Sequence, residues 1–280
     1  MTGVWTIARL TFDGAARRRV LWALSLLGLA ALGLYALGLA TVRSGLDSGF
    51  GPDDPRILEA GQNFLMMAGL YAANFLIVMM TVLISLDTLA GEIHNETIQS
   101  LAVKPLRRVE IVLGKWLGFA GILGVYIALL DGGIMLLVAA ILGYAAPKPL
   151  IGIGVMYLES VLLLSLTMLA GSRLSMLAGG AVVFGLHGVA FIGGWVGQFG
   201  SLLGSAGATN IGKVANLILP TEGLWRYAAA QMQSSLFGLA RFASPFTVGG
   251  APGAEIIVYA AAFSAAALLL AIWQFNRRDL

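Results

Sequence analysis

Three ionisable side chains lie within long apolar stretches of the sequence: Asp131, Glu159 and His187. An ionised group inside a lipid bilayer is costly, so each of them is a candidate functional residue. The functional interpretation is that they line a polar path for a substrate or form a cation site. The alternative is a structural role, in which each group is protonated or hydrogen-bonded to a neighbouring helix.

Two other patterns resemble chemical sites without completing them. One histidine and two carboxylates on separate helices make a weak metal pattern, and the chain has no cysteine. The stretch GATNIGKV, from Gly207 to Val214, has P-loop spacing but ends in Val where Ser or Thr must bind magnesium. We therefore expect the chain to bind no metal, nucleotide or other cofactor of its own.

The composition indicates an integral membrane protein. Of the 280 residues, 59% are hydrophobic and 11% are charged, and the mean hydropathy is +0.88. Soluble domains carry about 25% charged residues. The net charge of +3 is too small to indicate a nucleic-acid partner. The absence of cysteine also excludes disulfides and cysteine nucleophiles.

The elements that must position the three ionisable residues are membrane-spanning helices. A helix needs about 20 apolar residues to cross the hydrocarbon core, and six stretches are long enough. The first is too long for the apolar part of a signal peptide. We predict an all-α membrane protein whose single transmembrane domain covers residues 1–280. The predicted spans are 20–42, 63–87, 116–143, 150–171, 174–198 and 256–275.

The distribution of Lys and Arg sets the orientation of these spans. With both termini inside, eleven of the 17 Lys and Arg residues fall in the inner segments, as the positive-inside rule requires. At 1.5 Å per residue, Asp131, Glu159 and His187 lie about 18, 14 and 17 Å from the outer ends of their spans. We therefore expect the three side chains to share one layer near the membrane midplane.

Residues 2–17 have the pattern of an amphipathic helix. Trp5, Ala8, Phe12 and Ala15 fall on one face, opposite a polar face. We predict that this helix lies in the inner membrane interface, because its aromatic side chains need an apolar environment. The alternative is a solvated helical arm.

The segment 199–255, between the fifth and sixth spans, is not a polar loop. Within it, LPTEGLWRYAAAQMQ predicts a short helix with Thr221 as its N-cap after Pro220. We expect short outer helices that dip into the outer leaflet or cap the bundle. A small outer subdomain on the membrane surface is the alternative.

Glycine pairs at G-x-x-x-G spacing occur at Gly114 and Gly118 and at Gly200 and Gly204. This spacing permits close approach of two helices. Because the chain contains 37 glycines, matches by chance are expected, and the pattern alone indicates no particular contact.

The most charged segment is GEIHNETIQSLAVKPLRRVEIVLGK, residues 91–115, which follows the uncharged run 64–86. A short helix is expected up to Lys104, because Pro105 disfavours helix at the residue before it. A second helix should begin near Leu106 and continue into the third span. We interpret the segment as a short helix that projects into the cytoplasm. A routine charged hairpin is the alternative.

This segment, extended to Trp116, resembles the region after the second span of ABC-2 type transporter permeases. The shared features are an acidic residue, Glu-Thr, Leu, a Pro followed by Arg, and a Gly-Lys that opens the third span. The hydropathy profile, the amphipathic N-terminal helix and the terminal FNRRDL are similar as well. The stretch LPTEGLWRY resembles the subgroup that contains the permease of the nitrous oxide reductase maturation system.

The resemblance implies a permease subunit of an exporter in the bacterial cytoplasmic membrane. Its partners would be membrane lipid, a second copy of this chain and two copies of a separate cytoplasmic ATPase that binds ATP and magnesium. The helix near 92–104 would be the coupling helix that sits in a groove of the ATPase. The residues implied in coupling are Glu92, His94, Glu96, Thr97, Leu101, Lys104, Pro105, Arg107 and Arg108.

The alternative to a permease is a stand-alone six-helix membrane protein, either channel-like or an intramembrane enzyme. Such a protein would use Asp131, Glu159 and His187 directly. The family resemblance leaves the substrate open among metal or sulfur species, lipids, peptides and drugs.

Overall fold

A computed structural model describes the chain except for residues 1, 50, 95–106, 234–251 and 278–280, and it leaves out the side chains of residues 2 and 87–94. The described residues form helices joined by turns, with no strand among them. Six of these helices are long and apolar enough to cross a membrane, as predicted. They are α2 (Arg19–Asp47), α3 (Pro55–His94), α5 (Arg108–Leu142), α6 (Pro149–Gly171), α7 (Met176–Leu202) and α10 (Glu255–Asn276).

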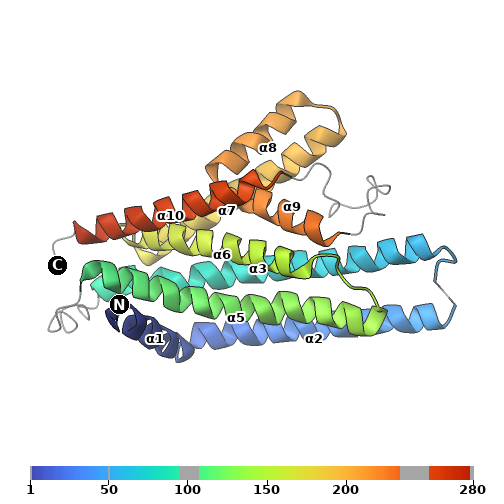
Figure 1. The fold of residues 1–280 in the computed structure, drawn as a ribbon, viewed down its shortest axis with the longest axis horizontal. Coiled ribbons are helices and arrows are strands. Elements are labelled where there is room, and N and C mark those ends of the chain that lie inside the picture. Colours follow the sequence, from blue (N-terminus) through green and yellow to red (C-terminus); the bar gives the residue numbers. More distant parts are fainter. Residues whose placement is uncertain (1, 50, 95–106, 234–251, 278–280) are drawn as a thin grey trace.

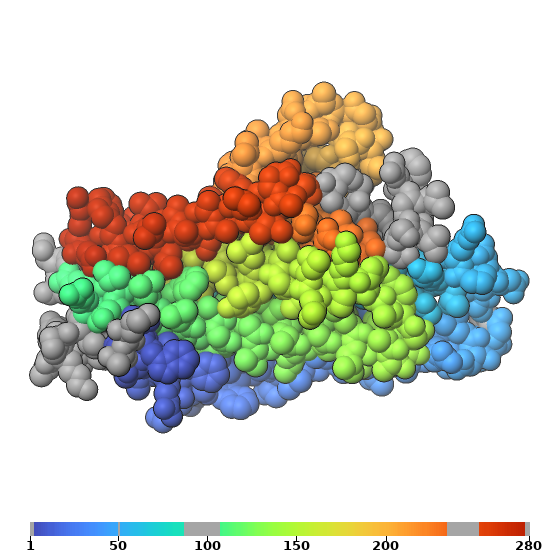
Figure 2. All heavy atoms as spheres, in the orientation of Figure 1, coloured from blue at the N-terminus to red at the C-terminus, as the bar shows by residue number. Residues whose placement is uncertain are grey.

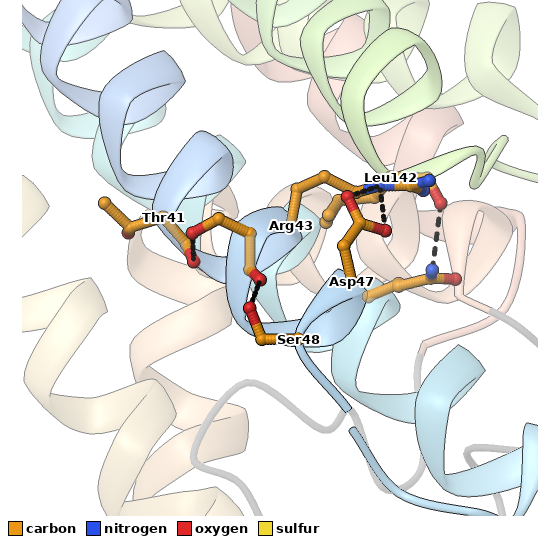
Figure 3. A network of polar contacts seen from close by, with 7 residues as sticks. Thr41, Arg43, Asp47, Ser48 and Leu142 are labelled. Atoms are coloured by element: carbon orange, nitrogen blue, oxygen red, sulfur yellow. Dashed lines mark hydrogen bonds and ion pairs between the residues drawn. The ribbon is translucent and has the colours of Figure 1, made fainter. Parts of the chain in front are cut away.

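The long helices run side by side as an elongated bundle (Figure 1). We call the end that holds α1 and the last turn of α10 the proximal end, and the opposite end the distal end. At the proximal end, Arg108 donates to the carbonyl oxygen of Asn276 at 3.2 Å. At the distal end, Gln62 donates to the carbonyl oxygen of Leu142 at 2.9 Å (Figure 3). These contacts join α5 to α10 at one end and to α3 at the other.

The distal end of α2 also has a local polar network. Arg43 and Asp47, one turn apart, form an ion pair at 3.1 Å, and the Ser48 hydroxyl donates to the carbonyl oxygen of Ser44 (Figure 3). Side-chain bonds of this kind satisfy carbonyls near the end of a helix that have no partner within it.

The helices α3 and α6 form the centre of the bundle. In their most apolar windows, 61% and 67% of residues are buried, against 11% in α2 and 22% in α10. The start of α6 is set by Pro149, because proline suits the first helical turn. The end of α5 is set by Gly143, whose φ of +74° closes the helix in a conformation that favours glycine. Polar residues on α3 and α6 are therefore held in the most enclosed part of the fold.

The N-terminal helix α1 (Thr2–Ala16) packs directly on the proximal part of α5. A Cβ atom at Gly114 would lie 2.6 Å from the Cβ of Ile7, and one at Gly118 would lie 2.7 Å from the carbonyl oxygen of Ala8. The pair Gly114 and Gly118 is therefore a true helix contact rather than a chance match. The side chains of Trp5 and Phe12 stay exposed, and their place in the membrane interface stays a prediction.

After α7 the chain turns at Gly204, whose φ is +68°, and returns as α8 (Ala206–Ile218) along the distal part of α7. The contact is a seam of small residues, which lets the two backbones approach closely. Facing each other across it are Gly193 with Ala215, Gly197 with Gly212, and Gly200 with Ala208. The hairpin stands out from the side of the bundle (Figure 2).

A second short helix, α9 (Thr221–Met232), leads back to the bundle. Its last residue, Met232, packs on Gly152 near the start of α6. The prediction of Thr221 as N-cap is wrong: Pro220 takes the cap position and Thr221 is the first residue of the helix. The Thr221 side chain is buried in the fold.

Candidate functional site

Glu159, on the central helix α6, is 1% exposed. Its Oε1 atom accepts a hydrogen bond from the amide of Asn74 on α3 at 3.4 Å, while Oε2 has no hydrogen-bond partner among the described residues. The amide oxygen of Asn74 is also buried without a partner there. A buried polar atom without a partner is costly, and such atoms are few in folded proteins. Glu159 and Asn74 therefore each place a buried oxygen atom without a hydrogen-bond partner, among the described residues, inside an apolar bundle.

Asp131, on α5, is fully buried, and within the described part of the chain neither of its carboxyl oxygens has a hydrogen-bond partner. Its charge acts on Glu159, so the structure brings together two of the three residues predicted to share a layer. His187, on α7, is partly buried, and no charged group among the described residues acts on it. The structure gives no link between His187 and the two carboxyls.

Glu222, the second residue of α9, is a member of the site that the sequence did not reveal. Its side chain is 7% exposed and lies against Gly194 on α7, where an added Cβ would be 2.1 Å from its Cγ. Its charge acts on Glu159. Burial raises the pKa of Glu222 to about 8, and the positive charge of Arg226, one turn further along α9, lowers it by less.

An aromatic layer lies beside these carboxyls. The indole N–H of Trp195 on α7 donates to the Tyr71 hydroxyl on α3 at 2.8 Å. The ring of Tyr71 also meets Trp225 on α9 edge-on at 5.1 Å and Phe191 on α7 at 6.1 Å, measured between ring centroids. The charges of Glu222 and Glu159 both reach Tyr71. Three helices thus place aromatic rings next to the carboxyl groups.

Two of these aromatic residues, Trp195 and Phe191, also line an open apolar groove of about 410 Å³ on the α7–α8 hairpin. Trp195 and Phe191 therefore belong both to the layer around Tyr71 and to the wall of the groove. The other lining residues are Ile192, Val196, Phe199, Gly200, Leu203, Ser205 and Ala208. The groove is therefore connected, through Trp195 and Phe191, to the Tyr71 ring that the charges of Glu222 and Glu159 reach.

A family model described as ABC-2 family transporter protein matches residues 5–280. The chain belongs to the ABC-2 transporter family. No curated protein matched the chain. Family membership makes it a multi-pass membrane protein and the membrane component of an ABC transporter, which is not itself catalytic. It also implies association with an ABC ATPase subunit in general.

In this ABC-2 transporter, the segment predicted to couple to the ATPase is described only in part. The helix α3 continues to His94, so Glu92 and His94 lie in its last turns. At the other end, Arg107 precedes α5, and the Glu110 carboxylate accepts from the Arg107 backbone N–H at 3.3 Å. The residues Glu96, Thr97, Leu101, Lys104 and Pro105 lie outside the described residues. Both flanks belong to helices of the bundle core.

The apparent P-loop of the transporter has a different structure. Gly207 to Val214 falls entirely within the helix α8, whereas a phosphate-binding loop must present its backbone N–H groups from a non-helical turn. Among the described residues, His, Asp and Glu form no group of three that is placed to hold a metal ion. The site described above consists of carboxyl, amide and aromatic groups.

Proposed function

We propose that this chain is the permease subunit of an ABC-2 type exporter in the bacterial cytoplasmic membrane, and that a separate ATPase binds at the proximal end. Both termini lie on the cytoplasmic side in this proposal, because that places most Lys and Arg inside. Two copies of the chain form one pathway with two ATPase subunits, each of which binds ATP and magnesium. Family membership favours this function over a stand-alone six-helix protein.

The observation that carries the proposal is the glycine contact between α1 and α5. The helix α5 starts at Arg108, directly after the segment predicted to meet the ATPase. Gly114 and Gly118 hold α1 against the first turns of α5, and Arg108 ties the same turns to the end of α10. A displacement of the segment would therefore move three helices together, since packed interfaces transmit strain.

The same helix reaches the candidate site. Asp131 lies on α5, and its charge acts on Glu159. The distance along the helix from Arg108 to Asp131 is about 35 Å at 1.5 Å per residue. We infer that closure of the ATPase pair is carried along α5 to the carboxyl groups of the translocation path. His187 is retained as a candidate for the path, although it is separate from the carboxyl groups.

The test is co-purification of the tagged chain expressed from its native operon. A P-loop ATPase present in an equal amount, together with crosslinked dimers of the chain, would support the proposal. A chain that purifies without any ATPase, and that is monomeric by native mass spectrometry, would contradict it.

A further inference from the structure

Within the described residues, the carboxyl groups of the site outnumber the cations that act on them. Asp131, Glu159 and Glu222 are all at least nine-tenths buried, and their charges interact. Arg226 acts on Glu222, whereas among the described residues no cation acts on Asp131 or Glu159. Three of the four oxygen atoms of Asp131 and Glu159 have no hydrogen-bond donor in that part of the chain. A buried cluster of acceptors of this kind requires a positive ligand or protons.

The rings beside the cluster suit an organic cation better than a metal ion. Tyr71 contacts the rings of both Trp195 and Trp225, and the charges of Glu159 and Glu222 both reach Tyr71. Aromatic faces attract ammonium groups, and the attraction strengthens when the site is shielded from water. Metal ions instead need several oxygen, nitrogen or sulfur ligands at short range.

The groove on the α7–α8 hairpin supplies the apolar half of a binding site. Its volume of about 410 Å³ lies in the range of 300–1,000 Å³ typical of small-molecule sites. It shares Trp195 and Phe191 with the aromatic layer, so the same two side chains form part of the groove wall and contact the ring of Tyr71. The hydrogen bond from Trp195 to Tyr71 joins the groove wall to the ring that the charges of Glu159 and Glu222 reach.

We propose that the groove and the carboxyl cluster are two halves of one site for a cationic amphiphile, a molecule with an apolar body and an ammonium or phosphonium centre. The apolar body binds in the groove, and the cation reaches Glu159 and Glu222 when the Trp195–Tyr71 hydrogen bond breaks. This inference rests on the proposed transport function and names the substrate class for it. Molecules with an anionic head would be repelled by the same carboxyls.

The test measures binding of tetraphenylphosphonium to the purified chain in detergent, by quenching of tryptophan fluorescence. Tetraphenylborate has the same shape and the opposite charge, so it is the matched control probe. We expect the phosphonium to bind and the borate to bind at least about tenfold more weakly, a difference of 1.4 kcal/mol. Because the pKa of Glu222 is about 8, phosphonium binding should strengthen as the pH rises from 7 to 9.

The variants assign the binding to this site. Glu159→Gln combined with Glu222→Gln, and separately Trp195→Leu, should each weaken phosphonium binding about tenfold or more. Glu255→Gln changes an exposed carboxyl at the start of α10 and should leave binding unchanged. Glutamine matches the shape of glutamate and removes a buried charge, so the carboxyl variants should fold, which gel filtration and circular dichroism would verify.

The results separate this inference from the proposed function. Equal binding of the two probes, or phosphonium binding unaffected by the carboxyl variants, would overturn the cationic site, even if an ATPase co-purifies. Such a result would mean that protons satisfy the buried carboxyls. Binding that depends on charge and on the carboxyls supports the site in the isolated chain, whether or not an ATPase partner is found.

Discussion

Glu222 fills the space that any side chain at Gly194 would need: a Cβ placed there would lie 2.1 Å from the Glu222 Cγ. This contact fixes the first turn of α9 against α7 and positions a carboxyl beside Tyr71 and Glu159. It joins α9 to α7 through an ionisable side chain.

Gly194→Ala should therefore displace Glu222 and destabilise the protein by about 1–3 kcal/mol, the usual cost of overpacking a tight core. Gly188→Ala is the matched control on the same helix, because no heavy atom lies within 4 Å of an added Cβ there. Thermal unfolding of both variants in detergent measures the difference. Equal melting temperatures would show that the contact between Glu222 and Gly194 is loose.

The raised pKa of Glu222 predicts a pH dependence of stability. Burial raises this pKa from 4.5 to about 8, so between these values the folded chain holds more protons than the unfolded one. The free energy of unfolding must then fall as the pH rises through this window. The groups acting near Glu222 are Arg226 on α9, Tyr71 on α3 and Glu159 on α6.

The measurement is the melting temperature of wild type and Glu222→Gln from pH 6 to pH 9. Wild type should lose stability relative to the variant as the pH rises, because glutamine does not ionise. If the two curves run parallel from pH 6 to pH 8, Glu222 has an ordinary pKa and is more hydrated than this structure indicates.

The six spans could be predicted from the sequence because apolar runs of sufficient length have few other stable arrangements. The contacts between the helices could not be predicted from the sequence. Gly114 and Gly118 both contact α1, whereas in the pair Gly200 and Gly204 the second glycine forms the turn after α7. In a chain with 37 glycines, only the three-dimensional arrangement separates a packing glycine from a turn glycine.

The candidate site was predictable only where a charge interrupts an apolar run. Asp131 and Glu159 are conspicuous for this reason, and they do interact. Glu222 lies in a segment of mixed polarity, and its burial depends on how α8 and α9 fold back onto the bundle. His187 satisfied the same sequence criterion as the two carboxyls, but neither carboxyl acts on it in the structure.

The contact between α1 and α5 predicts a variant that uncouples the transporter. Gly118→Val should push α1 away from α5, because an added Cβ would lie 2.7 Å from the Ala8 carbonyl oxygen. ATPase binding should persist while transport per ATP hydrolysed falls several-fold. Gly121→Val on the same helix meets open space and is the control. Normal coupling in the Gly118 variant would exclude α1 from the transmission path.

Asp131→Asn tests the polar layer within the spans. The substitution keeps the shape and removes a buried charge, so the chain should fold normally, while substrate-stimulated ATPase activity and transport should change. Asp47→Asn, at the exposed distal end of α2, is the matched control. If transport by Asp131→Asn equals that of wild type, Asp131 has only a packing role.

Charge reversals at the two ends of the coupling segment should have two different effects. Glu92 and Glu96 are four residues apart and would share one face of a helix. Replacing both with Lys should therefore weaken ATPase binding or uncouple ATP hydrolysis from transport. Membrane insertion of the chain should stay normal. Arg107 and Arg108 flank the start of α5, where each basic residue near anionic lipid contributes about 1 kcal/mol of anchoring.

Arg→Glu at both arginines should therefore mainly impair membrane insertion and orientation, and it also removes the hydrogen bond from Arg108 to Asn276. The readouts are the amount of co-purified ATPase per permease and the protease accessibility of the segment in inverted vesicles. Glu255→Lys, at the start of α10, is the control: it reverses a charge away from the coupling segment and should change neither readout. ATPase binding and transport that survive both Glu reversals would reduce the segment to a charged hairpin, and the ATPase would have to act through another surface of the proximal end.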